Sequence, residues 1–341
     1  MKIFTKIILV LTAITLLVVT ACHEKEIPEQ TYKVAMLAEG NTFDDLSFLQ
    51  SCKEGMEKAK GDFNLMVEYN IDTASNNYQE RIDYYGDQNF DLIIAIGFMW
   101  NDVVIAAAKK HPNSKYVIVD TELSETQINA VSILFDVDEA AFPLGFLSAW
   151  WADIHDSIAP KLGWVAALNI PQIQQFVEPY NNGAKYYNQQ YEKSVDIIGD
   201  FAGDLFNEEL GKHIADSLIN LSADLIFGVG SETGNGSLLK AKELGKAGIG
   251  VDVDQYYSFP EVSDILLSSA IKGLDNAIYE VVKSFVDNTF PSSDIYNGKL
   301  ANEGVGIAPY HDYESQIPDS IKTEIENIKT GIIDGSISTG W

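Results

Sequence analysis

The sequence predicts an α/β fold with parallel sheets, on the evidence of two patterns. Short apolar runs of strand length alternate with longer amphipathic stretches, and the connections between them carry Gly, Asp and Asn. The run Asp91–Phe98 is almost continuously apolar, as expected for a parallel strand that is covered on both faces. About ten such strands exceed what one ordinary sheet uses, which predicts two lobes.

The elements follow one another in a regular order. Strands are predicted at 34–38, 65–69, 91–98, 116–120, 130–135, 162–167, 195–198, 223–229 and 249–253. Helices are predicted at 46–60, before Tyr85, and at 103–110, 139–154, 173–190, 207–220 and 236–245. A further helix begins at Gly273, where apolar residues recur with the helical period. Cys52 falls within a helical pattern, which favours a small buried side chain there.

The composition excludes some classes of partner. The chain has 23 Lys and Arg against 50 Asp and Glu, a formal net charge of −27. Such an acidic surface disfavours nucleic acid, because binding to phosphates requires basic side chains. It equally disfavours electrostatic attachment to anionic lipid. Apolar residues make up 46% of the chain, which is enough for a large packed core.

The first residues predict a secreted, lipid-anchored protein. Lys2 and Lys6 precede an apolar run at 7–21, which is shorter than the roughly 20 residues that span a bilayer. The run ends in Val-Thr-Ala-Cys, which matches the signal at which bacterial lipoproteins are cleaved and lipidated on cysteine. We therefore expect a signal peptide over 1–21, a lipid (palmitate) on Cys22, and a polar tether over 22–31.

Polar residues at the carboxyl ends of predicted strands are the candidates for a binding site. Ligands of open α/β sheets bind there. The rule selects Glu39, Asp120, Asn169 and Asp252. The segment Gly228–Gly236 follows a strand and precedes a helix, so its N–H groups suit an anion or a polar oxygen. A tight turn without a ligand remains an alternative. The segment has neither the glycine spacing of a dinucleotide site nor the lysine of a P-loop.

The sequence contains no assembled set of catalytic residues. Asp44 and Asp45 are adjacent carboxylates that suit acid–base chemistry, but they precede a helix, where capping explains them as well. The five histidines are dispersed without the spacing of a zinc site, and no nucleophile elbow is present. We expect no enzymatic activity, no metal and no cofactor.

Three aromatic residues lie near element ends. Phe48 and Phe176 fall at helix starts, and Phe201 follows a strand. Taken alone, each is more often a core residue. Beside carboxylates, however, such rings can hold a flat, neutral molecule that bears hydroxyl groups, because rings stack on its faces and carboxylates accept its N–H and O–H groups.

At these residues the sequence resembles the basic membrane protein family, lipoproteins that serve as purine-nucleoside-binding receptors of ABC transporters. The matching segments span nearly all of the mature chain. They are DDLSFLQ at 44–50 with Glu54-Gly55, Val119-Asp120, Phe176 with Gly183-Ala184, Gly199-Asp200-Phe201, TGNG at 233–236, GVDVDQ at 250–255, and Ser269 with Lys272. The sequence departs from the family pattern at Glu39, Leu49 and Pro179, where the family has Asp, Asn and Gly.

The resemblance implies a type I periplasmic binding protein, with two Rossmann-like lobes and a three-segment hinge. Lobe one would comprise 32–136 and about 254–290, and lobe two 137–253 and about 291–341. Phe48 and Phe201 would stack on a purine whose edge contacts Asp120 and Glu39, with Phe176 on the wall of the cleft. The ribose contacts would come from the residues Asp252, Lys272, Gly228 and Gly230.

The function implied is capture of a nucleoside, by a monomer, for delivery to an ABC permease and its ATPase on the extracytoplasmic face of a membrane. Two alternatives stay open at this point. One is a receptor or sensor for another small ligand, such as a sugar or an autoinducer. The other is a nucleoside hydrolase that uses Asp44 and Asp45.

Overall fold

A computed structural model describes residues 31–72, 77–156, 158–292 and 294–341. The predicted signal peptide, Cys22 and all of the predicted tether except Thr31 lie outside the described residues. Residues 32–341 form one compact unit, which contains both predicted lobes. Within the described residues, no helix is both long and apolar enough to cross a bilayer.

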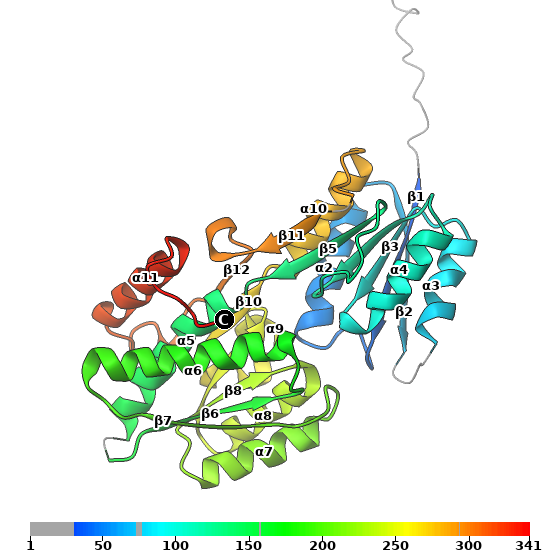
Figure 1. Ribbon diagram of the computed structural model, residues 1–341. Coiled ribbons are helices and arrows are strands. Elements are labelled where there is room, and N and C mark those ends of the chain that lie inside the picture. The colour runs from blue at the N-terminus through cyan, green and yellow to red at the C-terminus, as the bar shows by residue number, and fades with distance from the viewer. Residues whose placement is uncertain (1–30, 73–76, 157, 293) are drawn as a thin grey trace, which may run out of the picture. The chain divides into compact units, whose positions relative to one another are not determined.

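Two six-stranded sheets form the framework of the described chain (Figure 1). The first has the order β11 (Ile295–Gly298), β5 (Ala130–Phe135), β4 (Lys115–Val119), β3 (Leu92–Ile96), β1 (Tyr32–Glu39), β2 (Leu65–Asp72). The second has the order β12 (Val305–Ile307), β10 (Leu266–Lys272), β9 (Ala247–Asp252), β8 (Leu225–Val229), β6 (Lys161–Ala166), β7 (Asp196–Phe201). The recorded pairings are parallel apart from β10–β12. The predicted α/β fold with two parallel-sheet lobes is confirmed.

Apolar residues of the first sheet point alternately to two buried layers. In β3, Ile94 belongs to the core under α2 (Phe48–Asp62), whereas Ile93 belongs to the core under α3 (Tyr78–Asp87) and α4 (Asn101–Lys110). All five residues of β3 are buried, since helices cover both faces of the sheet. Cys52 is fully buried on α2 as a free thiol, in agreement with the prediction of a buried side chain.

The second sheet is also covered on both faces. Helices α5 (Asp138–His155) and α6 (Pro171–Tyr191) lie on one side, and α7 (Glu208–Asn220) and α8 (Ser231–Glu243) on the other. Glycines allow α5 and α6 to approach closely. A Cβ on Gly145 would lie 1.8 Å from the Tyr180 carbonyl oxygen, and one on Gly183 would lie 1.9 Å from that of Phe142.

The chain crosses between the sheets at three places, which agrees with the predicted three-segment hinge. The crossings follow β5, follow β10 and connect β11 to β12. Sheet membership differs from the predicted division, however. Strand β10 extends the second sheet beside β9 before α10 (Leu274–Val286) returns to pack on α2, and β11 belongs to the first sheet. The predicted division placed 254–290 wholly in lobe one and 291–341 wholly in lobe two.

The remaining elements are mostly short. They are α9 (Gln255–Ser258), α11 (Asp319–Ile333), which packs on α5, and the 3₁₀ turns η1 (Phe98–Trp100), η2 (Pro260–Ile265), η3 (Leu300–Asn302), η4 (His311–Tyr313). Three strands, β10 to β12, and the helices α9 and α11 were not predicted from the sequence.

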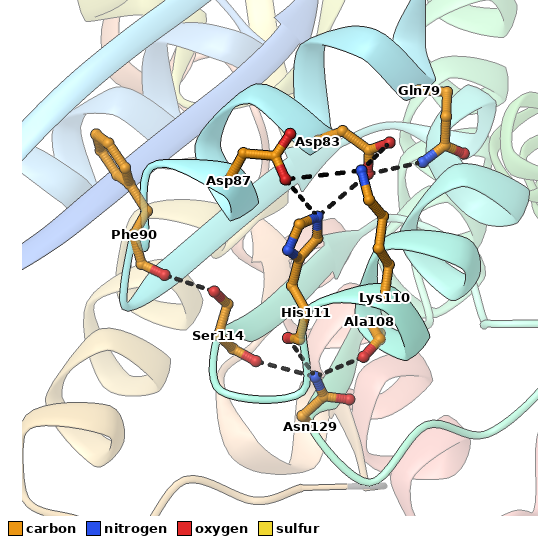
Figure 2. Close-up of polar contacts among 9 residues, drawn as sticks. All are labelled: Gln79, Asp83, Asp87, Phe90, Ala108, Lys110, His111, Ser114 and Asn129. Atoms are coloured by element: carbon orange, nitrogen blue, oxygen red, sulfur yellow. Dashed lines mark hydrogen bonds and ion pairs between the residues drawn. The ribbon is translucent and has the colours of Figure 1, made fainter.

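A polar cluster ties α3 and α4 together at the amino-terminal end of the first sheet (Figure 2). The His111 ring lies near Asp83 and Asp87 of α3, with Nε2–oxygen distances of 3.5 and 3.7 Å. The amide of Asn129 donates to three main-chain carbonyls, those of Ala108, His111 and Ser114. The cluster lies before the start of β4, at the opposite end of the strand from Asp120, so it is structural support for the lobe.

Candidate ligand-binding site

A cavity lies where the carboxyl ends of strands from both sheets meet. Counted together with the open space at its mouth, it has a volume of about 730 Å³. Seven of the nine residues predicted to contact a ligand line it: Glu39, Phe48, Asp120, Phe176, Gly230, Asp252 and Lys272. The structure thus brings together residues that are up to 233 positions apart (272 − 39) in the sequence.

Two predicted residues are absent from the walls. Phe201 ends the edge strand β7, and its ring packs edge-on against Trp164 with a centroid distance of 5.0 Å. Phe206, in the loop that follows, lines the cavity instead. Gly228 lies within β8 under helix α8, where a Cβ would come within 2.6 Å of the Gly234 carbonyl oxygen. The glycine at 228 therefore serves strand–helix packing.

The predicted loop Gly228–Gly236 is largely helical. Helix α8 begins at Ser231, so the TGNG segment forms its first turns. A Cβ on Gly236 would lie 2.0 Å from the Glu208 carbonyl oxygen, and one on Gly211 would lie 2.0 Å from that of Thr233. These glycines permit close packing of α7 on α8. Of this segment, the residues that line the cavity are Val229, Gly230 and Ser231.

The backbone is strained where the acidic residues enter the site. Asp120 and Asp252 have φ values of +65° and +68°, and Ser231 has +45°. Each follows or ends a strand, and left-handed φ values cost non-glycine residues on the order of 1–3 kcal/mol. The surrounding contacts must hold these turns in place, which is typical of residues at ligand-binding sites.

One end of the cavity is a buried charge cluster around Lys272. Its ammonium lies 2.9 Å from Asp120 Oδ1 and 4.0 Å from Asp252 Oδ1, and the residue is only 3% exposed. Ser47 Oγ donates to Asp252 Oδ2 at 2.8 Å. Burial raises the pKa of Asp252 to about 6 although Lys272 lowers it, so its carboxyl is mostly ionised at neutral pH. Burial alone would lower the pKa of Lys272, but the two carboxylates more than offset this and raise it.

Aromatic rings flank this cluster. The Lys272 ammonium lies 5.1 Å from the centroid of the Phe48 ring and 5.2 Å from that of Phe176. Phe48 is half-buried at the start of α2, while Phe176 is almost fully buried in α6. Leu205, Phe206, Phe98 and Met99 extend the apolar wall. Rings and aliphatic side chains of this kind suit the apolar faces of a flat ligand.

The other end of the cavity is formed by Glu39, the last residue of β1. Its Oε2 accepts a short hydrogen bond from the Tyr78 hydroxyl. Strands β4, β3 and β1 are neighbours in this order, so Asp120 and Glu39 end strands two spacings apart, which is roughly 10 Å. Sequence reasoning grouped Asp120 with residue 39 on one ligand edge, whereas the structure pairs Asp120 with Lys272.

The cavity walls carry more acid than base. Among the described residues that line it, four supply carboxyl groups, Glu39, Asp45, Asp120 and Asp252, against the single ammonium of Lys272. Burial raises the pKa of Asp45, against the opposing effect of its hydrogen bonds. The site thus offers many acceptors and few donors, which favours ligands that bring N–H and O–H groups.

Asp44 and Asp45 do not form a pair for acid–base chemistry. The Asp45 carboxylate accepts from the main-chain N–H groups of Ser47, Leu49 and Gln50, and so caps the start of α2. Asp44 is exposed and forms an ion pair with Lys53 at 2.7 Å. The capping alternative therefore accounts for Asp45.

The loop before α2 connects the two lobes across the site. Asn41 donates to Glu232 at 2.8 Å, Asn235 to the Asp45 carbonyl at 3.1 Å, and Ser258 to the Leu46 carbonyl at 2.9 Å. The Leu46 side chain packs against the apolar core of the second lobe. These contacts hold the lobes together around the cavity. Among the described residues, no group of three His, Cys, Asp or Glu side chains is arranged to hold a metal ion.

Comparison with known proteins agrees with this architecture. Residues 31–339 match the family model described as the PnrA-like ABC transporter substrate-binding protein. The chain belongs to this family. Basic membrane protein A of Borreliella burgdorferi is 31% identical over 97% of this chain and 94% of its own length. The ABC transporter nucleoside-binding protein BmpA of Lactococcus lactis is 27% identical over 90% of this chain and 88% of its own.

A solved structure supports the fold of this PnrA-like protein. An ABC transporter solute-binding protein from Aeropyrum pernix superposes with a TM-score of 0.84 at 23% identity, over 90% of this chain and 92% of that one. The role comes from the family match over residues 31–339, which makes the chain an ABC transporter substrate-binding protein. Sequence reasoning missed Phe98, Met99 and Phe206 as wall residues. Applying the strand-end rule to β3 would have found the first two.

Proposed function

We propose that this PnrA-like protein captures a purine nucleoside between its lobes and delivers it to an ABC permease. The observation that carries the proposal is the spacing of two polar ends across an aromatic-walled cavity. Glu39 and Asp120, which pairs with Lys272, lie at the ends of strands roughly 10 Å apart. This is about the length of a molecule with a polar base edge at one end and a sugar at the other. The named nucleoside-binding relative supports the same ligand class.

Each end of the cavity suits one half of a nucleoside. Asp120 and Asp252 accept hydrogen bonds from ribose hydroxyls, while Lys272 donates to a hydroxyl or ring oxygen from between them. The base lies against the rings of Phe48 and Phe176, with its donor edge at Glu39. A ligand that lacks the hydroxyls would leave buried polar groups unpaired, which makes discrimination strong.

The proposal includes anchoring on the extracytoplasmic face of a membrane through a lipid on Cys22. The sequence of residues 1–22 supports it, as does the description of a relative from Pyrococcus abyssi, 27% identical over 80% of this chain, as a lipoprotein. The protein would act as a monomer that binds without making or breaking a covalent bond. The hydrolase alternative is disfavoured, because Asp45 caps helix α2 and Asp44 forms an exposed ion pair with Lys53.

Isothermal titration calorimetry on residues 23–341 tests this function. We expect inosine to bind at one site with micromolar or tighter affinity, and free ribose or glucose to bind far more weakly. Inosine 5′-monophosphate is the matched control. We expect it to bind at least roughly 100-fold more weakly, because its phosphate would enter a cavity with surplus carboxylates. Tight sugar binding without nucleoside binding, or release of hypoxanthine from inosine, would contradict the proposal.

A further inference from the structure

We propose that Tyr78 is a positioning residue that fixes the Glu39 carboxylate, so that the site selects bases with an N–H group on the facing edge. This inference rests on the proposed nucleoside ligand. Tyr78 itself does not line the cavity, whereas Glu39 does. The link between them is the hydrogen bond from the Tyr78 hydroxyl to Glu39 Oε2.

The Tyr78 ring is held in place independently of the ligand. It packs edge-on against Trp100 with a centroid distance of 4.9 Å, and the Trp100 side chain is fully buried. Trp100 follows directly after Phe98 and Met99, which form part of the cavity wall. The packing of Tyr78 on Trp100 therefore holds the Tyr78 hydroxyl in a fixed position, and Trp100 is itself adjacent in sequence to wall residues of the cavity.

Helix α3 also fixes the main chain next to Glu39. Arg81, one turn after Tyr78, donates to the carbonyl of Ala38 at 2.8 Å and lies over the Trp100 ring at 4.9 Å. The helix thus contacts both the side chain of residue 39 and the main chain that precedes it. With Oε2 engaged by Tyr78, the rotation of the carboxylate is restricted and Oε1 keeps its acceptor capacity for the ligand.

A fixed carboxylate distinguishes donors from acceptors. A carboxylate oxygen accepts a hydrogen bond and repels a lone pair. Inosine presents N1–H on its base edge, whereas purine riboside presents a bare N1 with the same sugar. A tyrosine hydroxyl also remains a donor here, because burial and the adjacent Glu39 raise the pKa of Tyr78. Glu39 should consequently favour inosine over purine riboside, and this preference should depend on the Tyr78 hydroxyl.

The test compares the affinities of inosine and purine riboside in wild type and Tyr78→Phe. Phenylalanine keeps the ring contact with Trp100 and removes only the hydroxyl. We expect wild type to bind inosine more tightly than purine riboside. In Tyr78→Phe the ratio of the two affinities should fall about tenfold, chiefly because inosine binds more weakly. Tyr69→Phe is the matched control: it removes a similar tyrosine–glutamate hydrogen bond, to Glu57 at 2.6 Å, outside the site. It should leave the preference unchanged.

The outcomes separate this inference from the function on which it rests. If wild type binds no nucleoside, the proposed function fails. If wild type binds inosine but Tyr78→Phe keeps the preference within twofold, the positioning role is overturned. Glu39→Gln provides a second measurement that does not depend on the Tyr78 variant folding. Its amide can donate to N1, so it should raise the affinity for purine riboside relative to inosine. An unchanged ratio would overturn the role of Glu39 at the base edge.

Discussion

Replacing Lys272 with methionine is expected to lower the free energy of unfolding by about 3–5 kcal/mol at pH 7 and to abolish nucleoside binding. Lys272 is 3% exposed and is the ammonium that faces Asp120 and Asp252. Methionine retains much of the length of the side chain but leaves two carboxylates without their cation in a poorly hydrated site, and removing one partner of a buried ion pair has an effect of this size. Urea denaturation and calorimetric titration measure the two losses.

The pH dependence provides a check on this cause. The pKa of Asp252 is already raised to about 6 in wild type, and loss of Lys272 removes a neighbour that lowers it. A carboxyl whose pKa is raised in the folded state lowers the free energy of unfolding at pH values above that pKa. This destabilisation decreases as the pH falls through the pKa, because the folded protein then binds the proton. The loss of stability in Lys272→Met should therefore become smaller as the pH falls from 7 to 5.

The matched control is Lys53→Met, which removes an exposed ion pair with Asp44. It should lower the free energy of unfolding by less than about 1 kcal/mol at either pH. A similarly small loss in Lys272→Met would contradict the account.

Replacing Phe48 with alanine is expected to weaken nucleoside binding by about 1–3 kcal/mol, or roughly 5- to 150-fold. The half-buried ring lines the cavity at the start of α2, and loss of a ring that stacks on a base has effects of this size. Calorimetric titration of inosine measures the change. Phe201→Ala is the matched control, since its ring packs on Trp164 away from the cavity and its removal should leave the affinity unchanged. Equal affinities for wild type and Phe48→Ala would assign Phe48 to the core alone.

Residues at strand ends are the ones for which the sequence prediction and the cavity lining agree best. Asp120 and Asp252 each lie at the carboxyl end of an apolar run, so the strand-end rule was sufficient to select both. They end strands of different sheets, and it is the packing of the two lobes that brings them to one cavity. Phe201 shows the limit of this rule. Whether a ring enters the cavity depends on the course of the loop after the edge strand, and that course selects Phe206, five residues later.

Glycines and distant partners were harder to interpret from the sequence. The TGNG segment is compatible with a ligand-binding turn, but its glycines also permit the close packing of α7 on α8 that the structure shows. Tyr78 carries no local motif, and it reaches Glu39 only because α3 lies beside the end of β1. Strand β10 was missed, although it carries Lys272, because its apolar run is short and contains two serines.

A crystal structure of the protein with inosine tests the central claim most directly, because it shows where the ligand lies. We expect density for one nucleoside inside the cavity, with the base against Phe48, the ribose hydroxyls within hydrogen-bond distance of Asp252 and Lys272, and the base edge at Glu39. Density for inosine outside this cavity, or a cavity that stays empty at saturating inosine, would contradict the account.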